Sequence, residues 1–360
     1  MSPGVRENPR KPMNRRNLAA ICAFLVPSLA PSLATSSALA ETYVQSYGAP
    51  ALDRWNYPFN PTPGTRITAS TFGNDPTSEL FDNRDGQFIV GFNTSADIPT
   101  GLGTSTYQVV ACTVTLTYAN DFVVEYDNTV DPYTAFLPES DPDYVADADP
   151  GQPIEVFGVG FRNGFTLMNW NETSPFAPVG ANVLNPSVRN AFAVARNASG
   201  AWSDISNSVR DRMTPSPFAV GTIDGLKPGE LVPLGSTMRF ELDVSRADVQ
   251  EYLREAINAG RLRLTVSSLT KVVQQGGNYP QFYCRENPVV VFTGVGAATL
   301  DIEVTTTSCV PADLDCDGAV AAADLSLLLA SWGTTGSDAD LDGDGIVGAA
   351  DLSLLLASWG

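Results

Sequence analysis

Apolar and polar residues alternate in short runs through most of the chain, and this pattern predicts β-strands. The clearest run is 107–118, where one set of alternate positions is apolar: Val110, Cys112, Val114, Leu116 and Tyr118. A period of two is typical of a strand with one buried face. Similar runs predict strands at 87–92, 122–126, 154–160, 191–196, 218–223, 238–244, 262–267, 289–292 and 299–304. Their number and spacing predict a mainly β domain over 41–304, arranged as a β-sandwich or jelly roll.

One short helix is expected between two of these strands. Ser245 is placed to cap it, with Asp248 three residues later, and Gly260 is placed to end it. The positions expected to form its buried face are Val249, Leu253, Ala256 and Ile257.

The last fifty residues contain one pattern twice, and here the period changes from strand to helix. Each copy places carboxylates at loop positions 1, 3, 5 and 12, glycine at 6 and a β-branched residue at 8, which is the calcium-loop spacing of an EF-hand with Asp in place of Glu at position 12. With the backbone carbonyl of position 7, the predicted ligands of two Ca²⁺ ions are Asp313, Asp315, Asp317, Ala319 and Asp324 in the first loop, and Asp340, Asp342, Asp344, Ile346 and Asp351 in the second.

The residues around these ligands complete the predicted unit. Gly318 and Gly345 allow the sharp turn, and Val320 and Val347 are placed to pair the two loops as a short β-bridge. Each loop runs into the same string, Leu-Ser-Leu-Leu-Leu-Ala-Ser-Trp-Gly. Its apolar positions recur at helical spacing and predict packing of the two copies on each other: Leu325, Leu328, Leu329 and Trp332, then Leu352, Leu355, Leu356 and Trp359.

The duplicated pattern over 312–360 resembles a type I-like dockerin, the loop–helix module that binds cohesin domains and attaches secreted proteins to a scaffold or surface. An EF-hand proper has a helix before each loop, whereas here 310–312 and 336–338 contain Pro, Gly and Ser. The Leu-Leu-Ala-Ser-Trp-Gly endings are similar to tails of planctomycete-type secreted proteins. The resemblance implies calcium binding and a cohesin-like or other surface protein as partner of 309–360. Cellulosomal dockerins carry polar or basic residues late in the helix, where this chain has Leu329-Ala330 and Leu356-Ala357.

The β region resembles the carbohydrate-associated jelly-roll modules of the DNRLRE type over about 65–305. The resemblance rests on a few strings in order: Phe88–Phe92, Asp97–Pro99, Val109–Tyr118, Phe240–Val244 with the helix that follows, Leu262–Leu269 and Thr299–Val304. It implies polysaccharide as a ligand. The segment 127–235 is longer than such a module requires.

The N-terminus is typical of a secretory signal. Arg15-Arg16 precede an apolar stretch from Leu18 to Leu33, and Ala38-Leu39-Ala40 forms a small-x-small cleavage site. A membrane span is the alternative, but the stretch is short and contains prolines at 27 and 31. We therefore predict a signal peptide at 1–40, no membrane span after its removal, and a secreted or cell-surface protein.

Export permits disulfides, and four cysteines remain after cleavage. Sequence alone leaves three pairings open. We favour Cys309 with Cys316, at the entrance to the first loop, and Cys112 with Cys284; four buried or free thiols are the alternative. The segment 305–308 is the expected linker between the β domain and the dockerin-like domain at 309–360.

Composition excludes several classes of function. The net charge is −19, of which 309–360 contributes −9, so the surface repels nucleic acid. The chain has no histidine, which excludes Ser-His-Asp and Cys-His catalysis and His-ligated zinc. No catalytic residue is assigned. Carboxylate pairs that a glycosidase could use are Asp121 with Glu125 and Glu241 with Asp243, but such pairs are common on exposed strands.

Three other groups of residues are candidate binding sites. Trp55, Tyr57 and Phe59 alternate and suit either a sugar-stacking platform or a strand that packs on the core. Trp170 and Trp202 lie in polar, turn-rich surroundings that suit a binding loop or a plug at the end of the sandwich. The acidic stretch 139–149 suits a calcium site or an exposed turn, of which we favour the turn.

Three functions remain. The chain is expected to be a non-catalytic secreted protein whose β domain binds polysaccharide or serves in surface assembly, with a calcium-dependent docking tail. The alternatives are a divergent polysaccharide-degrading hydrolase or lyase with a dockerin, and an envelope structural protein.

Overall fold

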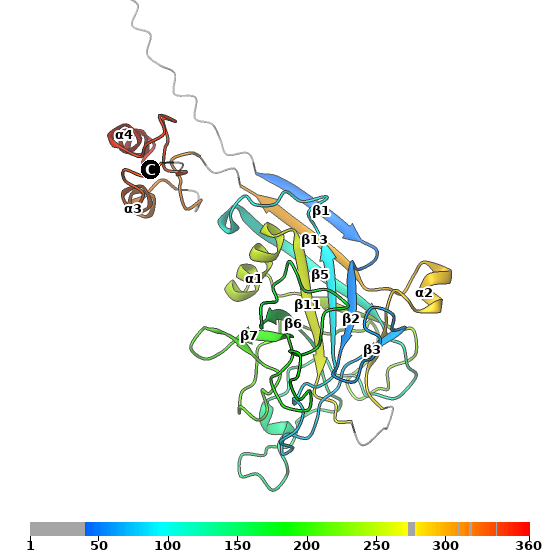
Figure 1. The fold of residues 1–360 in the computed structure, drawn as a ribbon. Helices are drawn as coiled ribbons and strands as arrows, with labels where there is room; N and C mark the ends of the chain where they lie inside the picture. The colour runs from blue at the N-terminus through cyan, green and yellow to red at the C-terminus, as the bar shows by residue number, and fades with distance from the viewer. Residues whose placement is uncertain (1–39, 273–277, 308–309, 317–318, 336) are drawn as a thin grey trace, which may run out of the picture. The chain divides into compact units, whose positions relative to one another are not determined.

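The computed structural model describes residues 40–272, 278–307, 310–316, 319–335 and 337–360. The predicted signal peptide, the linker residue Ser308, and the predicted site residues Asp317 and Gly318 lie outside this part of the chain. The described chain is mainly β, as the sequence predicts, and its strands are followed by two short helices in the tail (Figure 1).

Two antiparallel sheets form the β region. The first has four strands in the order β1 (Glu41–Tyr47), β13 (Thr299–Thr306), β5 (Tyr107–Thr117) and β10 (Thr237–Glu241). The second has seven strands, with β2 (Leu52–Asn56), β4 (Gln87–Asn93), β11 (Arg261–Ser268), β6 (Ile154–Phe161), β7 (Ala191–Arg196) and β8 (Trp202–Asp204) in order and β9 (Ala219–Val220) paired with β6. A two-stranded ribbon joins β12 (Gln281–Tyr283) to β3 (Thr68–Ser70). Two 3₁₀ turns, η1 (Thr104–Thr106) and η2 (Tyr133–Phe136), lie in the connections.

Side chains from both large sheets share one apolar core. Val114 and Leu116 of β5 are fully buried in the same cluster as Val90 of β4 and Leu264 of β11. Burying such side chains contributes about 1.5–3 kcal/mol each, so this shared core is what holds the two sheets together.

A β-bulge changes the alternation that the sequence predicts in β5. Along β13, Glu303 pairs with Ala111 and Val304 pairs with Val109, so Val110 has no partner. The extra residue reverses which face each earlier side chain points to. Val109 is therefore fully buried while Val110 is 46% exposed, and the prediction that Val110 shares the buried face is wrong.

Helix α1 (Ala247–Asn258) forms where the sequence predicts it and packs against β5 and β11. All four residues predicted for its inner face are buried. Its start differs from the prediction: the N-cap is Arg246, because the Ser245 hydroxyl donates to Asp243 and does not cap the helix.

Two predicted strands are absent from the described chain. The segment 289–292 lies in helix α2 (Pro288–Thr293), because the Asn287 side chain accepts a hydrogen bond from the Val289 amide and Pro288 occupies the first turn. The segment 122–126 contains only a bridge from Glu125 to Leu231, because Phe122 adopts a left-handed φ of 52° that interrupts an extended chain.

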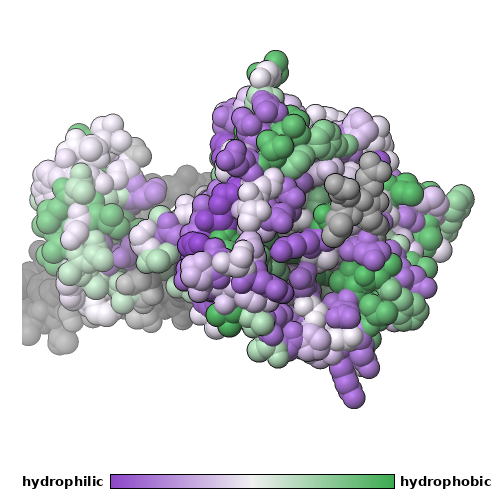
Figure 2. All heavy atoms as spheres, turned by 90° about the horizontal axis from the view of Figure 1, so that it is seen from below, coloured by the Kyte–Doolittle hydropathy of each residue, from purple (hydrophilic) through white to green (hydrophobic). Residues whose placement is uncertain are grey.

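Helix α2 lies at the edge of the β region (Figure 1), and most of its apolar side chains are exposed. Val291 and Phe292 are among the most exposed large apolar residues of the described chain. Apolar patches of this kind interrupt the largely polar surface in Figure 2.

The predicted pairing of Cys112 with Cys284 is wrong, because both are free, buried thiols. The bridge between Tyr118 and Phe282 explains their separation. Cys112 lies opposite Ile302 of β13, whereas Cys284 directly follows β12, whose bridge to β5 lies at Tyr118, six residues further along that strand. Cys316 is disulfide-bonded, and Cys309, its predicted partner, lies outside the described residues.

The tail has a small core of its own. Helices α3 (Ala322–Ala330) and α4 (Ala349–Ala357) each bury one leucine completely, Leu328 and Leu355. These leucines pack with Val320, Val347 and two alanines.

Two details of the predicted tail differ. The Val347 amide donates to Thr334 and its carbonyl accepts from Gly333, so Val347 pairs with the chain after α3 and the predicted bridge to Val320 is wrong. The predicted apolar stripes also do not extend to Leu329 and Trp332 or to their equivalents in the second copy. Both helices end before the tryptophans, and all four side chains are about half exposed.

None of the helices in the described ranges is both long and apolar enough to cross a lipid bilayer.

Candidate metal centres

Each repeated loop brings three aspartates together. In the first loop these are Asp313, Asp315 and Asp324, and in the second Asp340, Asp342 and Asp351, which are positions 1, 3 and 12 of each copy. Within each group, one carboxylate oxygen of each residue lies within 4.8 Å of the others. The equivalence of the two groups follows from the repeated sequence, since twelve contiguous residues determine each loop.

The aspartate at position 12 organises the loop through its backbone. Asp324 accepts hydrogen bonds from the amides of Leu314 (2.7 Å), Asp315 (3.2 Å) and Ala321 (2.7 Å). Burial opposes ionisation of this carboxyl, but the three amide donors outweigh it and lower the pKa of Asp324.

The second copy repeats this arrangement. Asp351 accepts from the amides of Leu341 (2.7 Å), Asp342 (3.1 Å) and Gly348 (2.6 Å). The Gly348 amide is the main cause of the lowered pKa of Asp351. Both position-12 carboxylates are therefore held ionised at the start of a helix, where negative charge is favoured.

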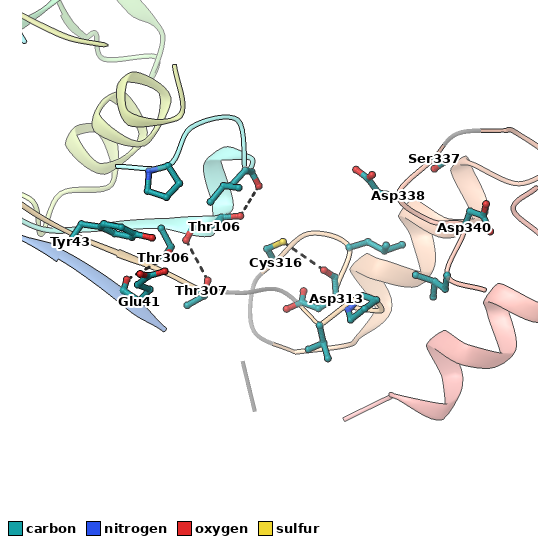
Figure 3. A pocket seen from close by; sticks show the side chains of 16 residues that line it. Glu41, Tyr43, Thr106, Thr306, Thr307, Asp313, Cys316, Ser337, Asp338 and Asp340 are labelled. Carbon is teal, nitrogen blue, oxygen red and sulfur yellow. Dashed lines mark hydrogen bonds between the residues drawn. The ribbon is translucent and has the colours of Figure 1, made fainter. Parts of the chain in front are cut away.

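The backbone of the loops turns sharply at two positions. Gly343 at position 4 and Gly345 at position 6 have φ angles of 73° and 97°, a region that favours glycine. The first copy has Cys316 at position 4 with φ of 58°, and its sulfur atom lies 3.8 Å from the Asp313 carbonyl oxygen (Figure 3). A left-handed φ at a non-glycine residue is uncommon, and here the residue is also disulfide-bonded.

One oxygen in the second loop indicates that these residues fit a cation. Asp340 Oδ2 accepts from the Gly345 amide at 2.8 Å, whereas its Oδ1 is buried and has no hydrogen-bond partner among the described residues. A buried carboxylate oxygen without a donor is costly, and a hard cation with oxygen ligands removes that cost.

The remaining predicted ligands are less well defined. Asp344 is exposed, and its Oδ1 accepts from the Ile346 amide at 2.9 Å, so this side chain is not part of the group of three. Asp317 lies outside the described residues. The roles of the Ala319 and Ile346 carbonyls stay predictions.

The candidate aromatic sites are mostly covered. Trp170 is buried with Arg54 over its ring at 5.0 Å, which suits a plug rather than a binding loop. Trp55 stacks on Tyr57 with ring centroids 4.7 Å apart, and Arg66 covers the ring from 5.0 Å. In this group Phe59 is the exposed member, at 53%.

Trp202 is also enclosed by its neighbours. Arg196 lies over its ring at 4.4 Å, and Tyr252 meets it edge-on at 5.9 Å. The indole Nε1 donates to Glu251 at 3.4 Å. These contacts suit a side chain that closes the space beside α1.

Three of the four carboxylates considered as catalytic pairs have partners in the described chain. Asp121 accepts from the Leu234 amide, Glu241 pairs with Arg239 at 2.9 Å, and Asp243 accepts from the Ser245 amide. These contacts give each a local role on a strand end or turn.

The structure brings together a third acidic group that sequence reasoning missed: Asp127, Asp131 and Asp149. The available signal was weak, since Asp127 and Asp131 are four residues apart in a turn-rich segment without the EF-hand spacing. Of the acidic stretch 139–149, Asp141 and Asp143 pair instead with Arg212, at 2.8 and 2.6 Å.

Comparison with known proteins does not assign the chain to a family. No family model matches the chain, and no curated protein matches it.

Proposed function

We propose that the chain is a secreted, non-catalytic protein with two parts. A jelly-roll-like β-sandwich binds polysaccharide or serves in surface assembly, and a dockerin-like tail attaches it to a cohesin-like or other surface protein when calcium is bound. The observation that carries this proposal is the pair of aspartate groups at positions 1, 3 and 12 of the two loops, each with oxygens within 4.8 Å.

The tail is built to depend on an ion. In the first loop the carboxylate oxygens lie within 4.8 Å of one another, and two charges at that separation repel by about 3–4 kcal/mol at an effective dielectric near 20. Among the described residues of the tail, the core that must hold the loops closed contains six buried apolar side chains, two of which are alanines. Calcium bound by oxygen ligands converts this repulsion into attraction, so we expect it to fold the tail.

The surface of the tail suits a protein partner. Leu327, Leu329 and Trp332 are 44–52% exposed, and the second copy exposes Leu354, Leu356 and Trp359 to nearly the same extent. Exposed aromatic and aliphatic groups of this kind are typical of docking surfaces. Because the apolar groups replace the polar residues of cellulosomal dockerins, we expect a more apolar partner face.

The β domain supports a binding role more than a catalytic one. Phe59, near the predicted mature N-terminus, has an exposed ring that lies against Tyr57. A sugar face would stack on this ring. The acidic pairs, in contrast, hold local backbone or arginine partners.

Calcium binding by the full chain after signal removal tests the tail. Flow dialysis should show that the double variant Asp324→Asn, Asp351→Asn binds two fewer calcium ions than the unaltered chain. Asp338→Asn is the matched control, because Asp338 is an exposed tail aspartate outside the ligand positions. Equal calcium binding by the double variant and the control would contradict the proposal.

Docking and glycan binding are tested separately. Purified chain should bind washed producing cells in calcium and be released by chelator, and the double variant Trp332→Ala, Trp359→Ala should bind calcium normally but lose attachment. Retention on an insoluble glycan without release of reducing ends supports the binding role. Release of reducing ends would identify a polysaccharide-degrading enzyme instead.

A further inference from the structure

A third cluster of carboxylates lies within the β region, in the long connection between β5 and β6. Asp127 follows Tyr126, Asp131 precedes η2, and Asp149 lies shortly before β6 begins at Ile154. Although these residues span more than twenty positions, one carboxylate oxygen of each lies within 4.8 Å of the others.

Two of these carboxyl groups are buried with an oxygen that has no partner. Asp127 is 2% exposed and Asp131 is 7% exposed. The Oδ2 atom of each is buried and accepts no hydrogen bond from any described residue. This differs from an ordinary acidic turn, where water or backbone amides satisfy the carboxylates.

Thr129 sets the orientation of the cluster. Its amide and hydroxyl both donate to Asp127 Oδ1, at 2.9 and 2.8 Å, and the same hydroxyl lies 3.2 Å from Asp149 Oδ2. These contacts use Oδ1 of Asp127 and leave its buried Oδ2 without a partner among the described residues.

The surrounding charges do not neutralise the cluster. Among the described residues, no lysine or arginine forms an ion pair with any of the three aspartates. Arg84 pairs instead with the buried Glu155, at 2.6 Å. Burial, and then Asp147 and the other carboxylates nearby, raise the pKa of Asp131 to about 8.

We propose that Asp127, Asp131 and Asp149 form a third calcium site, within the β domain and independent of the tail. Calcium–oxygen bonds are about 2.3–2.6 Å long, so oxygens that share one ion lie at most about 5 Å apart, which the cluster satisfies. The bound ion ties the connection between β5 and β6 to the start of β6.

The number of calcium ions bound by the full chain tests this site. Asp131→Asn keeps the side-chain shape and should lower the number by one, both in the unaltered tail and in the tail double variant. Glu139→Gln, an exposed change in the same acidic stretch, should leave the number unchanged. Because the comparison is made within each tail background, failure of the tail proposal does not affect its outcome.

Thermal unfolding of the β domain gives a second readout with a change of sign. In chelator, Asp131→Asn removes the cost of burying an ionisable carboxyl among other carboxylates and should raise the midpoint temperature of unfolding. In calcium it removes a ligand and should lower that temperature relative to the unaltered chain. Asp149→Asn, at a less buried position, should repeat both effects if Asp131→Asn folds poorly. Unchanged calcium binding, with the same shift in chelator and in calcium, would overturn the proposal.

Discussion

Calcium removal is expected to unfold helices α3 and α4 while α1 stays folded. The perturbation is chelation of the full chain, and the local variant is Asp324→Asn in the first loop. The Asp324 side chain is fully buried and accepts three backbone amides, so it links the start of α3 to positions 2 and 3 of its loop. We therefore expect both the ion and this carboxylate to be needed to hold the loop closed.

The magnitude follows from linkage. An ion that binds only the folded tail, at a thousand times its Kd, stabilises it by about 4 kcal/mol per site. Opening of α3 then becomes about a thousandfold more frequent when its ion is removed, because each tenfold change corresponds to about 1.4 kcal/mol. The Asn variant also replaces one acceptor oxygen with an amide that faces the Ala321 N–H, which adds roughly 1–3 kcal/mol.

Hydrogen exchange followed by mass spectrometry measures this opening by peptide. Peptides covering 322–333 and 349–360 should lose protection by up to three orders of magnitude in chelator. A peptide covering α1, whose inner face is buried in the β-domain core, serves as the internal reference in an Asp131→Asn background, which removes the proposed third site, and should change less than threefold. Asp338→Asn is the control for a charge change in the tail.

Two results would refute the reasoning. Protection of α3 and α4 that is the same in calcium and chelator would mean that the loops are stable without an ion. Equal loss of protection in α1 would mean that the β domain and the tail open together.

Three further predictions concern the β domain. Burial raises the pKa of Asp53 to about 7, so between about pH 4 and 7 the folded state holds a proton that the unfolded state has lost, and the free energy of unfolding falls as pH rises through that window. Measured by urea unfolding, the stability of Asp53→Asn relative to the unaltered chain should therefore rise by roughly 2–4 kcal/mol between pH 4.5 and 8. A difference that stays constant with pH would contradict this. Leu116→Ala should cost about 2–5 kcal/mol, whereas Val110→Ala at the bulge should cost less than about 1 kcal/mol, and similar costs would contradict the bulge. Cys112 and Cys284 should resist iodoacetamide in the folded chain, because both are buried and burial raises the pKa of both thiols. Both should react with it once the chain is denatured without a reductant. Mass spectrometry that finds them unreactive after denaturation would instead support a disulfide between them.

Features that depend on neighbouring residues in the chain could be predicted from the sequence. The inner face of α1 and the strand at Ala191–Arg196 match their predictions, because a repeated apolar spacing of 3.6 or 2 selects one backbone conformation. The two aspartate groups of the tail are of the same kind. Each lies in twelve contiguous residues, so the turn that brings positions 1, 3 and 12 together is local.

Features that depend on contacts between distant residues could not be predicted from the sequence. Val110 has the same local pattern as its buried neighbours, and only the pairing of β5 with β13 shows that it is the extra residue of a bulge. Three consecutive valines favour a strand, but the Asn287 cap and Pro288 in the first turn begin a helix there instead. In each case a tertiary or capping contact outweighs a weak local preference.

The sequence alone therefore determined the tail, its twin loops and the mainly β character of the rest, because periodicity and loop spacing act over fewer than about fifteen residues. Only the tertiary structure decided that Cys112 and Cys284 are apart and that Asp127, Asp131 and Asp149 are together. Their positions follow from strand register and from the path of a long connection, which depend on the packing of both sheets around one core.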